Sequence, residues 1–194
     1  IESISFDEYK GFGAAMTTAG QVDLFHVIGH TPEAPTYEAA FGDNKPKETL
    51  CYGAAEEEEI RHELDWAEDK DVDFVLLGCP HYSAFQIADA AKCLRGRKCK
   101  AKLVIMTAPA TQAQARINGD AQIIEEAGGL LTCCCPPMVA TWPDGIKVLA
   151  TDSAKMAHYV PGTKEYRIHA GSAEHCIEAA VTGIRRASDL PIAA

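Results

Sequence analysis

Short apolar runs alternate with longer segments of helical periodicity along most of this chain, and this alternation constrains the fold more than any other feature. Strands separated by helices predict βαβ units, which join into a largely parallel sheet with helices on both faces. We therefore expect an α/β fold, a three-layer sandwich, as one domain over residues 1–186 with a tail at 187–194. The predicted strands cover residues 22–28, 48–52, 72–77, 102–106, 130–133 and 146–150.

Several helix starts carry capping signals. Ser5 and Glu8 have the spacing of a capping box, and Ser83 and Ser172 each precede an apolar helical stripe. Thr31 is followed by a proline and an acid, which favour the first turn of a helix. A plain N-cap is the preferred interpretation of Ser172, although a helix start can also bind an anion. We expect helices from Ser5, Thr31, Ser83 and Ser172, and over residues 54–67 and most of 109–127.

Charge and composition exclude several classes of partner. The net charge of −10 argues against binding to nucleic acid or to an anionic membrane surface. No apolar run approaches the roughly 18 residues that a membrane span needs. Eight cysteines in a chain with long helical segments do not resemble a small disulfide scaffold. We expect a cytoplasmic protein whose cysteines are reduced thiols or metal ligands.

Polar and thiol side chains follow the predicted strands at the point where each strand ends. Because the carboxyl ends of parallel strands meet at one edge of the sheet, where ligands bind in open α/β folds, we expect a site there. The residues at these strand ends are His26, Gly29, His30, Cys79, His81, Thr107, Cys133, Cys134, Cys135, Asp152 and Ser153.

The cysteines divide into candidate ligands and core residues. Side chains alternate along an extended segment, so Cys133 and Cys135 face one way and Cys134 faces the other. Cys79 with one or two of these thiols could bind a metal or an iron–sulfur cluster. Elsewhere a buried cysteine acts as a small hydrophobe, and this is the interpretation that we prefer for Cys51, Cys93, Cys99 and Cys176.

Five stretches of the sequence occur in the same order and at similar spacing in the large-subunit region of aconitase X proteins, and the chain resembles that family from its first helix to Arg186. The resemblance implies an aconitase-like domain of a hydro-lyase, which removes water from a small hydroxy acid of the phosphomevalonate or cis-3-hydroxy-L-proline class with an iron–sulfur centre. The stretches are DLFHVIGHTPEA at 23–34, LGCPHYS at 77–83, TCCCPPM at 132–138, ATDSAKMAHYVPG at 150–162 and GSAEHCIEAAVTG at 171–183.

The resemblance also implies roles for particular residues. Cys79 and Cys133 would be cluster ligands, and Ser153 would be the base, by analogy with the serine of aconitase. Lys155 could neutralise a substrate anion, unless it is a solvated surface lysine, and His81 could orient the substrate, unless it bonds to a nearby carbonyl. For His26 a core role in a strand is about as plausible as a functional one. The expected catalytic residues are Ser153, Lys155 and His81, and the expected substrate-binding residues are His26, Ser83, His158 and Tyr159.

The expected partners follow from the same resemblance. The chain opens at Ile1, not at a methionine, and we expect it to be the C-terminal part of a longer large subunit. Its partners would be the remaining N-terminal half and a small subunit or fused small domain. Without them we expect residues 1–194 to be inactive and to be purified without a cluster.

Two other functions are consistent with the sequence. One is a cysteine-dependent hydrolase with Cys79 as nucleophile and His81 nearby, although no third orienting group can be identified. The other is a non-catalytic assembly or regulatory domain.

Overall fold

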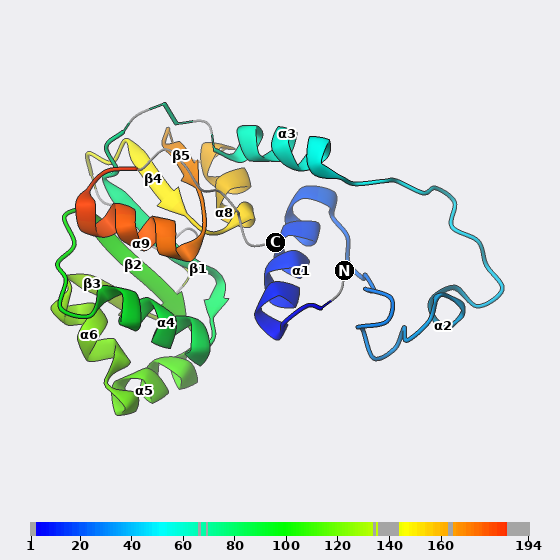
Figure 1. Cartoon of the computed structure of the whole chain (residues 1–194), viewed down its shortest axis with the longest axis horizontal. Coiled ribbons are helices and arrows are strands. Elements are labelled where there is room, and N and C mark those ends of the chain that lie inside the picture. The colour runs from blue at the N-terminus through cyan, green and yellow to red at the C-terminus, as the bar shows by residue number, and fades with distance from the viewer. Residues whose placement is uncertain are drawn as a thin grey trace.

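A computed structural model describes residues 3–65, 67–68, 70–133, 135, 144–162 and 165–185 (Figure 1). The predicted tail at 187–194 lies outside these residues. The helices are α1 (Phe6–Gly20), α2 (Tyr37–Phe41), α3 (Ala54–Leu64), α4 (Ala84–Leu94), α5 (Pro109–Asn118), α6 (Asp120–Glu126), α8 (Ala154–Tyr159), the 3-10 turn η1 (Val160–Gly162) and α9 (Ala173–Thr182). The strands are β1 (Phe74–Tyr82), β2 (Lys102–Thr107), β3 (Gly129–Thr132), β4 (Val148–Thr151) and β5 (Arg167–Ala170).

The strands form one parallel sheet in the order β3-β2-β1-β4-β5, so β1 is the central strand. Helices cover both faces, with α4 and α9 in front of the sheet and α8 behind it in Figure 1. The predicted α/β fold with a mostly parallel sheet and helices on both faces is confirmed.

Both faces of the sheet are buried because each central strand is apolar on both sides. In β1, Val75 and Leu77 pack toward α4 and α9, whereas Phe74 and Leu76 pack toward α8 and Met156. This double burial is typical of parallel strands, whose sequences are continuous apolar runs. Polar side chains of the sheet are therefore concentrated at its ends.

Three of the four predicted caps, Ser5, Ser83 and Ser172, begin the expected helices. The Ser5 hydroxyl accepts a hydrogen bond from the Glu8 N–H at 3.2 Å, and the Glu8 carboxylate accepts from the Ser5 N–H at 2.6 Å. Ser83 caps α4 with the same reciprocal pair of bonds, and the Ser172 hydroxyl caps α9 by accepting from the His175 N–H at 3.3 Å. Each cap satisfies a backbone donor that the first turn of a helix leaves free.

The prediction was wrong between α1 and α3. Residues 22–28 and 48–52 are not strands, and no helix begins at Thr31; the short helix α2 begins instead after the N-cap Thr36. Residues 22–28 do contain an apolar run, but its Phe25 ring packs on α1, at 5.1 Å from the Phe12 ring centre. No described strand lies alongside to pair with its backbone, and an isolated strand is not stable. His26 is therefore in an irregular, exposed segment and not in a strand.

The sequence analysis missed β5. This strand is short, and its alternation of Arg167 and His169 with Ile168 and Ala170 does not form an apolar run. Its His169 side chain is nevertheless buried, and Nδ1 lies 3.1 Å from an oxygen of Asp65.

Side-chain contacts hold α1 and α3 on the sheet. The Lys10 ammonium of α1 donates to the carbonyl of His81 at 2.7 Å and to the Gln86 side chain at 2.9 Å. Asp65, which ends α3, bonds to His169 of β5 and to Arg185. Figure 1 shows α1 beside α8, with α3 above it.

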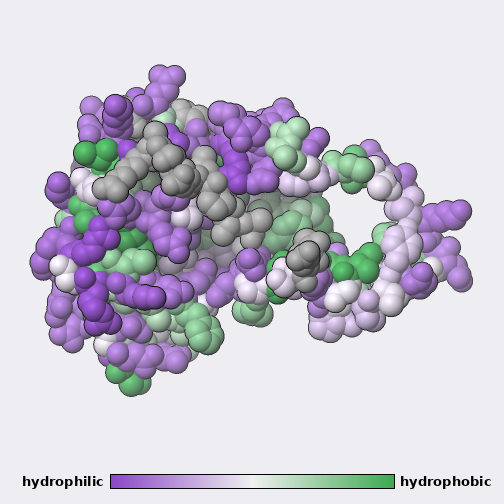
Figure 2. Space-filling view, in the orientation of Figure 1, coloured by the Kyte–Doolittle hydropathy of each residue, from purple (hydrophilic) through white to green (hydrophobic). Residues whose placement is uncertain are grey.

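Residues 21–53 run away from the sheet and return to it, as the blue-to-cyan ribbon on the right of Figure 1 shows. Leu24 and Leu50 in this segment are 77% and 83% exposed, and hydrophobic residues are visible in this part of Figure 2. Among the described residues, no helix has the length and apolar character that crossing a membrane requires.

The end of β1 departs from regular pairing. Leu77 pairs with Ile105 and Tyr82 with Thr107, so β1 has several more residues than β2 over this stretch. Gly78 has a φ of +90°, and a Cβ added there would lie 2.2 Å from the Met106 carbonyl oxygen. The strand can make this close approach only because residue 78 has no side chain.

We expect Gly78→Ala to destabilise the protein more than Gly128→Ala. Both glycines have nearly equal φ values, +90° and +91°, but nothing lies within 4 Å of a Cβ at Gly128. The φ strain common to both is worth about 1–3 kcal/mol. The clash with β2 should add about 2 kcal/mol or more at Gly78 alone. Urea unfolding of the two variants measures the difference; equal losses would show that the strands can separate to admit a methyl group.

Candidate functional site

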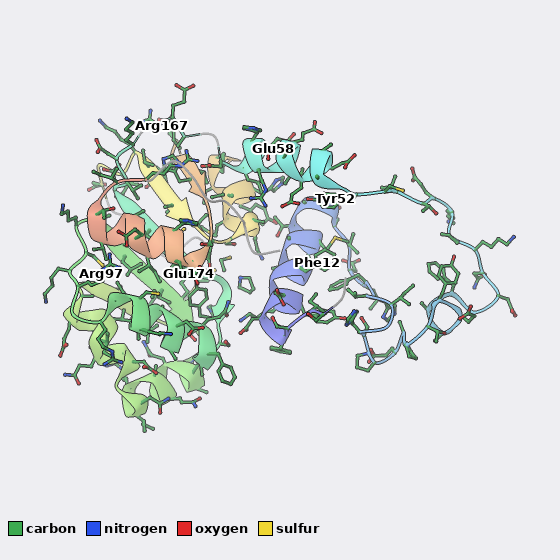
Figure 3. The ribbon with its side chains drawn as sticks, in the orientation of Figure 1. Phe12, Tyr52, Glu58, Arg97, Arg167 and Glu174 are labelled. Atoms are coloured by element: carbon green, nitrogen blue, oxygen red, sulfur yellow. The ribbon has the colours of Figure 1, made fainter. Side chains whose placement is uncertain are left out.

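A cavity of about 660 Å³ lies between α1, α3 and the carboxyl edge of the sheet. Phe12 of α1 and Tyr52, just before α3, belong to its wall and lie well away from Arg97 and Glu174 in Figure 3. The polar residues that line it are Asp7, Glu8, Lys10, Tyr52, Glu57, Arg61, Cys79, Tyr82, Gln86, Asp152, Ser153 and Lys155. The sheet edge and the two helices thus form one cavity, whose lining combines these polar side chains with apolar ones such as Met16, Ile60 and Leu64.

Cys79 and Ser153 come together at the ends of β1 and β4. The Ser153 hydroxyl donates to the Cys79 carbonyl and accepts from the Met156 N–H at 3.1 Å as the N-cap of α8. Ser153 is 6% exposed, yet it lines the cavity. The cap and the carbonyl contact therefore hold its hydroxyl in one position at the sheet edge.

The surroundings of Cys79 disfavour its thiolate. Burial raises the pKa of the Cys79 thiol, and the positive charge of Lys155 and the nearby Ser153 side chain offset part of this rise. The neighbouring thiol of Cys135 and the carboxyl of Asp152 raise that pKa further. Cys79 is consequently a protonated thiol at neutral pH unless a metal replaces its proton.

Asp152, which the sequence analysis placed at the expected site without a role, has an unusual acidity. Burial raises the pKa of its carboxyl from 3.8 to about 6, and hydrogen bonds from the Tyr82 hydroxyl and the Gly78 N–H limit the rise. Burial and the nearby Asp152 carboxyl together raise the pKa of Tyr82 well above its ordinary value. The only sequence signal for Asp152 was its position directly after a strand.

The α1 and α3 walls add charged groups. Lys10 is held by Asp7 at 2.9 Å and by Gln86, and Arg61 is held by Glu57, whose Oε1 accepts from Nε at 3.1 Å. No sequence motif assigned Asp7, Lys10, Glu57 or Arg61 to the site, because the chain brings them to the sheet edge only through its tertiary fold.

The remaining predicted residues are more scattered. Ser83 caps α4 and donates to Asp7 at 2.7 Å, so its hydroxyl is engaged within the protein. Cys133 follows β3 and is exposed, and its side chain is not part of the cavity wall. The side chains that are exposed and lie outside the cavity wall are those of His26, His81, His158 and Tyr159. Cys134 lies outside the described residues.

The donors present fit part of an iron–sulfur site. Cys79 lies in the cavity within electrostatic reach of Cys135, and Cys133 is two residues before Cys135. Within the described ranges, no three His, Cys, Asp or Glu side chains are grouped closely enough to hold a metal. These residues therefore supply thiol donors but not a complete ligand set.

Two family models match the chain in succession. The model described as the aconitase X second domain matches residues 1–62, and the aconitase X third domain matches residues 72–182. The first segment contains the α1 and α3 walls, and the second contains the sheet edge with Cys79 and Ser153. The cavity thus lies between the two matched segments.

Curated proteins and a solved structure are similar over most of the chain. A cis-3-hydroxy-L-proline dehydratase of Pseudomonas aeruginosa is 39% identical over 190 residues, 95% of this chain and 33% of the relative. A phosphomevalonate dehydratase large subunit of Methanothermobacter thermautotrophicus is 40% identical over 159 residues, 81% of this chain and 39% of the relative. The crystal structure of Thermococcus kodakaraensis aconitase X (holo-form) superposes with a TM-score of 0.77 at 29% identity, covering 93% of this chain and 45% of the other.

We expect Asp152→Asn to remove a pH dependence of stability. The pKa of Asp152 is raised to about 6 in the folded protein, so between pH 4 and 6 the folded state binds more protons than the unfolded state. The free energy of unfolding should therefore fall through this window as pH rises, by up to about 3 kcal/mol from this group. Urea unfolding at pH 4 and pH 7 should show this fall in the parent and not in Asp152→Asn.

The control is Asp89→Asn, at an exposed aspartate of α4, which should behave as the parent does. An unchanged pH dependence in Asp152→Asn would contradict the assignment.

Proposed function

The chain belongs to the aconitase X family, and we propose that it forms part of a hydro-lyase that removes water from a small hydroxy acid with the help of an iron–sulfur centre. The observation that carries the proposal is the cavity in which the sheet edge presents Cys79, Ser153 and Lys155 together. The relatives of the chain are dehydratases, which supports dehydration as the class of reaction.

The two relatives suggest the substrate. Cis-3-hydroxy-L-proline and phosphomevalonate both carry a hydroxyl and a carboxylate, and either would be a small molecule for a cavity of about 660 Å³. We propose a substrate of this hydroxy-acid class for the present chain. The net charge of −10 makes nucleic acid an unsuitable partner.

The reaction needs a base and a means of releasing hydroxide. We propose that Ser153 reacts as its alkoxide: its oxygen takes the proton from the carbon next to the substrate hydroxyl and becomes a neutral hydroxyl, the C–H electron pair forms the double bond, and the C–O bond breaks to release hydroxide. Lys155 lies close enough to affect Cys79 electrostatically, and its positive charge would stabilise the anionic groups of the substrate. The chemistry that an iron–sulfur centre supplies when bound is Lewis-acid assistance to the leaving hydroxyl.

We propose Cys79 and Cys133 as protein ligands of that centre, with Cys135 close by. Three thiolates are the usual minimum for a cluster that keeps one open iron, so a further ligand must come from elsewhere. The chain spans about a third of the length of the curated relatives that it matches first. We propose that further segments of a large subunit, and a small subunit or fused small domain, complete the enzyme, and that residues 1–194 alone are inactive and bind no stable cluster.

The alternative functions have less support. A nucleophilic cysteine needs a lowered pKa and an adjacent base, whereas burial raises the pKa of Cys79 and the His81 side chain is exposed outside the cavity wall. An assembly or regulatory domain would have no need of a cavity that gathers a thiol, a hydroxyl and charged side chains at the carboxyl edge of its sheet.

We expect Ser153→Ala to lower kcat of the complete enzyme by about 100- to 10,000-fold, the usual contribution of a general base. The substitution also removes the N-cap of α8, so Ser172→Ala is the matched control: Ser172 caps α9 in the same way and does not line the cavity. Each variant should lose about 1 kcal/mol of stability from its cap, but only Ser153→Ala should lose turnover. Similar activity in the two variants would exclude Ser153 as the base.

Iron content should separate the three described cysteines of the site. In the complete enzyme, Cys79→Ser and Cys133→Ser should each abolish iron binding and dehydration. Cys135→Ser should have an intermediate effect, through the surroundings of the cluster and not its attachment. Iron and sulfide analysis after anaerobic purification measures this, with circular dichroism to check folding and the exposed Cys51→Ser as control. Loss of iron in Cys135→Ser but not in Cys133→Ser would show that Cys135 is the second ligand.

A further inference from the structure

Arg61 has a buried nitrogen that none of the described residues satisfies. Its Nε donates to Glu57 Oε1 at 3.1 Å, and its Nη2 donates to the same oxygen. Nη1 is buried and has no hydrogen-bond partner among the described residues. The side chain as a whole is 15% exposed and lines the cavity.

A buried charged donor without a partner is unfavourable and rare in native proteins. Leaving such a group unsatisfied destabilises the fold unless something outside the protein completes its bonding. In a cavity wall, that role falls to a ligand with an oxygen acceptor, and a guanidinium matches anionic oxygens in particular.

Helix α3 carries Arg61 to the cavity on a defined face. Glu57, Ile60, Arg61 and Leu64 lie three or four positions apart and all line the cavity, which is the spacing of one helix face. Leu64 packs against the same hydrophobic cluster as Cys79. The contact of Asp65 with buried His169 then holds the end of this helix on β5. Arg61 is therefore placed in the cavity by a supported helix and not by a loose side chain.

The charges around Arg61 favour one kind of anion. Glu57 already supplies one negative charge to the guanidinium, and Asp7, Glu8 and Asp152 also line the cavity. Lys10 and Lys155 line the cavity too, so three cationic side chains stand against four acidic ones and leave a net charge near −1. A lining of this net charge repels a phosphate dianion about twice as strongly as a carboxylate, because repulsion scales with charge. A single carboxylate is thus the better match for the remaining Arg61 donor.

We propose that Arg61 binds the carboxylate of the substrate through Nη1, with Glu57 holding the guanidinium in position. This inference rests on the proposed function, because it assigns a group of that function's substrate. It makes α3 the substrate-anchoring element of a cavity whose proposed reacting groups, Ser153 and Cys79, belong to the sheet edge. Arg61 is then a determinant of substrate binding and not of the chemical step.

Kinetics of the complete, iron-loaded enzyme test the proposal with whichever of cis-3-hydroxy-L-proline and phosphomevalonate it dehydrates. Arg61→Gln should raise KM by about 10- to 100-fold, the loss expected for a hydrogen bond to a charged group, and leave kcat within about threefold. The KM of Arg61→Lys should lie between those of the parent and Arg61→Gln, since lysine keeps the charge without the planar guanidinium. Arg116→Gln is the matched control, an exposed arginine of α5 paired with Glu125 at 3.2 Å away from the cavity wall.

A second measurement identifies the anion. The methyl ester of the same substrate lacks the negative carboxylate, so the parent should bind the free acid at least about tenfold more tightly than the ester, whereas Arg61→Gln should bind the two about equally. Inhibition by acetate and by inorganic phosphate is then measured for the parent and for Arg61→Gln. Weaker inhibition by acetate in Arg61→Gln supports the carboxylate assignment, and weaker inhibition by phosphate alone overturns it.

The outcomes separate the two hypotheses. If the parent dehydrates a substrate but Arg61→Gln keeps its KM and its preference for the free acid, the Arg61 proposal is wrong and the proposed function stands. If Arg61→Gln loses kcat with KM unchanged, Arg61 acts in the chemical step and the anchoring role is wrong. If the complete parent enzyme dehydrates neither substrate, the proposed function fails and the Arg61 assignment fails with it. Circular dichroism checks that each variant folds, and Arg61→Lys gives the same test should Arg61→Gln not fold.

Discussion

The close approach of Gly78 to the backbone of β2 determines the geometry of the site. At this point β1 leaves regular pairing, and a side chain at residue 78 would collide with the carbonyl of Met106. The irregular end that follows carries Cys79 into the cavity and brings Tyr82 to Asp152. The Gly78 N–H also bonds to the Asp152 carboxyl, so the same residue shapes the strand and holds the acid of the neighbouring strand.

Because both faces of the sheet are buried, only the ends of its strands can present groups to a ligand. From Phe74 to Leu77 the side chains of β1 alternate between two apolar clusters, so groups that must meet a ligand can lie only at the irregular end of such a strand or just beyond it. Cys79 and Ser153 do so at the ends of β1 and β4, which are neighbours in the sheet. This neighbourhood in the sheet explains why the Ser153 hydroxyl reaches the backbone carbonyl of Cys79, although the two residues are far apart in the chain.

The sequence predicted the sheet well and the segment before it poorly, for one physical reason. Strands such as β1 and β2 are buried on both sides, and their continuous apolar runs are recognisable without knowledge of their neighbours. Residues 22–28 have a similar run, but it packs on α1 through Phe25, and only the tertiary structure reveals this. Cys79 and Ser153 could be found because they follow strands, whereas Arg61 could not, since nothing in its helix distinguishes it from a solvated arginine. Its importance comes from a cavity that two separate segments of the chain create.

The attachment of α1 and α3 has a consequence for how such a protein can diversify. Side-chain contacts of Lys10 and Asp65 hold these helices, and neither helix takes part in the strand pairing of the sheet. Substitutions on these helices can change the size and charge of the cavity without altering the hydrogen-bonded ladder beneath it. The boundary between the two matched family domains lies between α3 and β1, so each domain contributes a separate wall. Descendants of one ancestor could therefore acquire new substrates by altering the helical wall while inheriting an unchanged sheet edge.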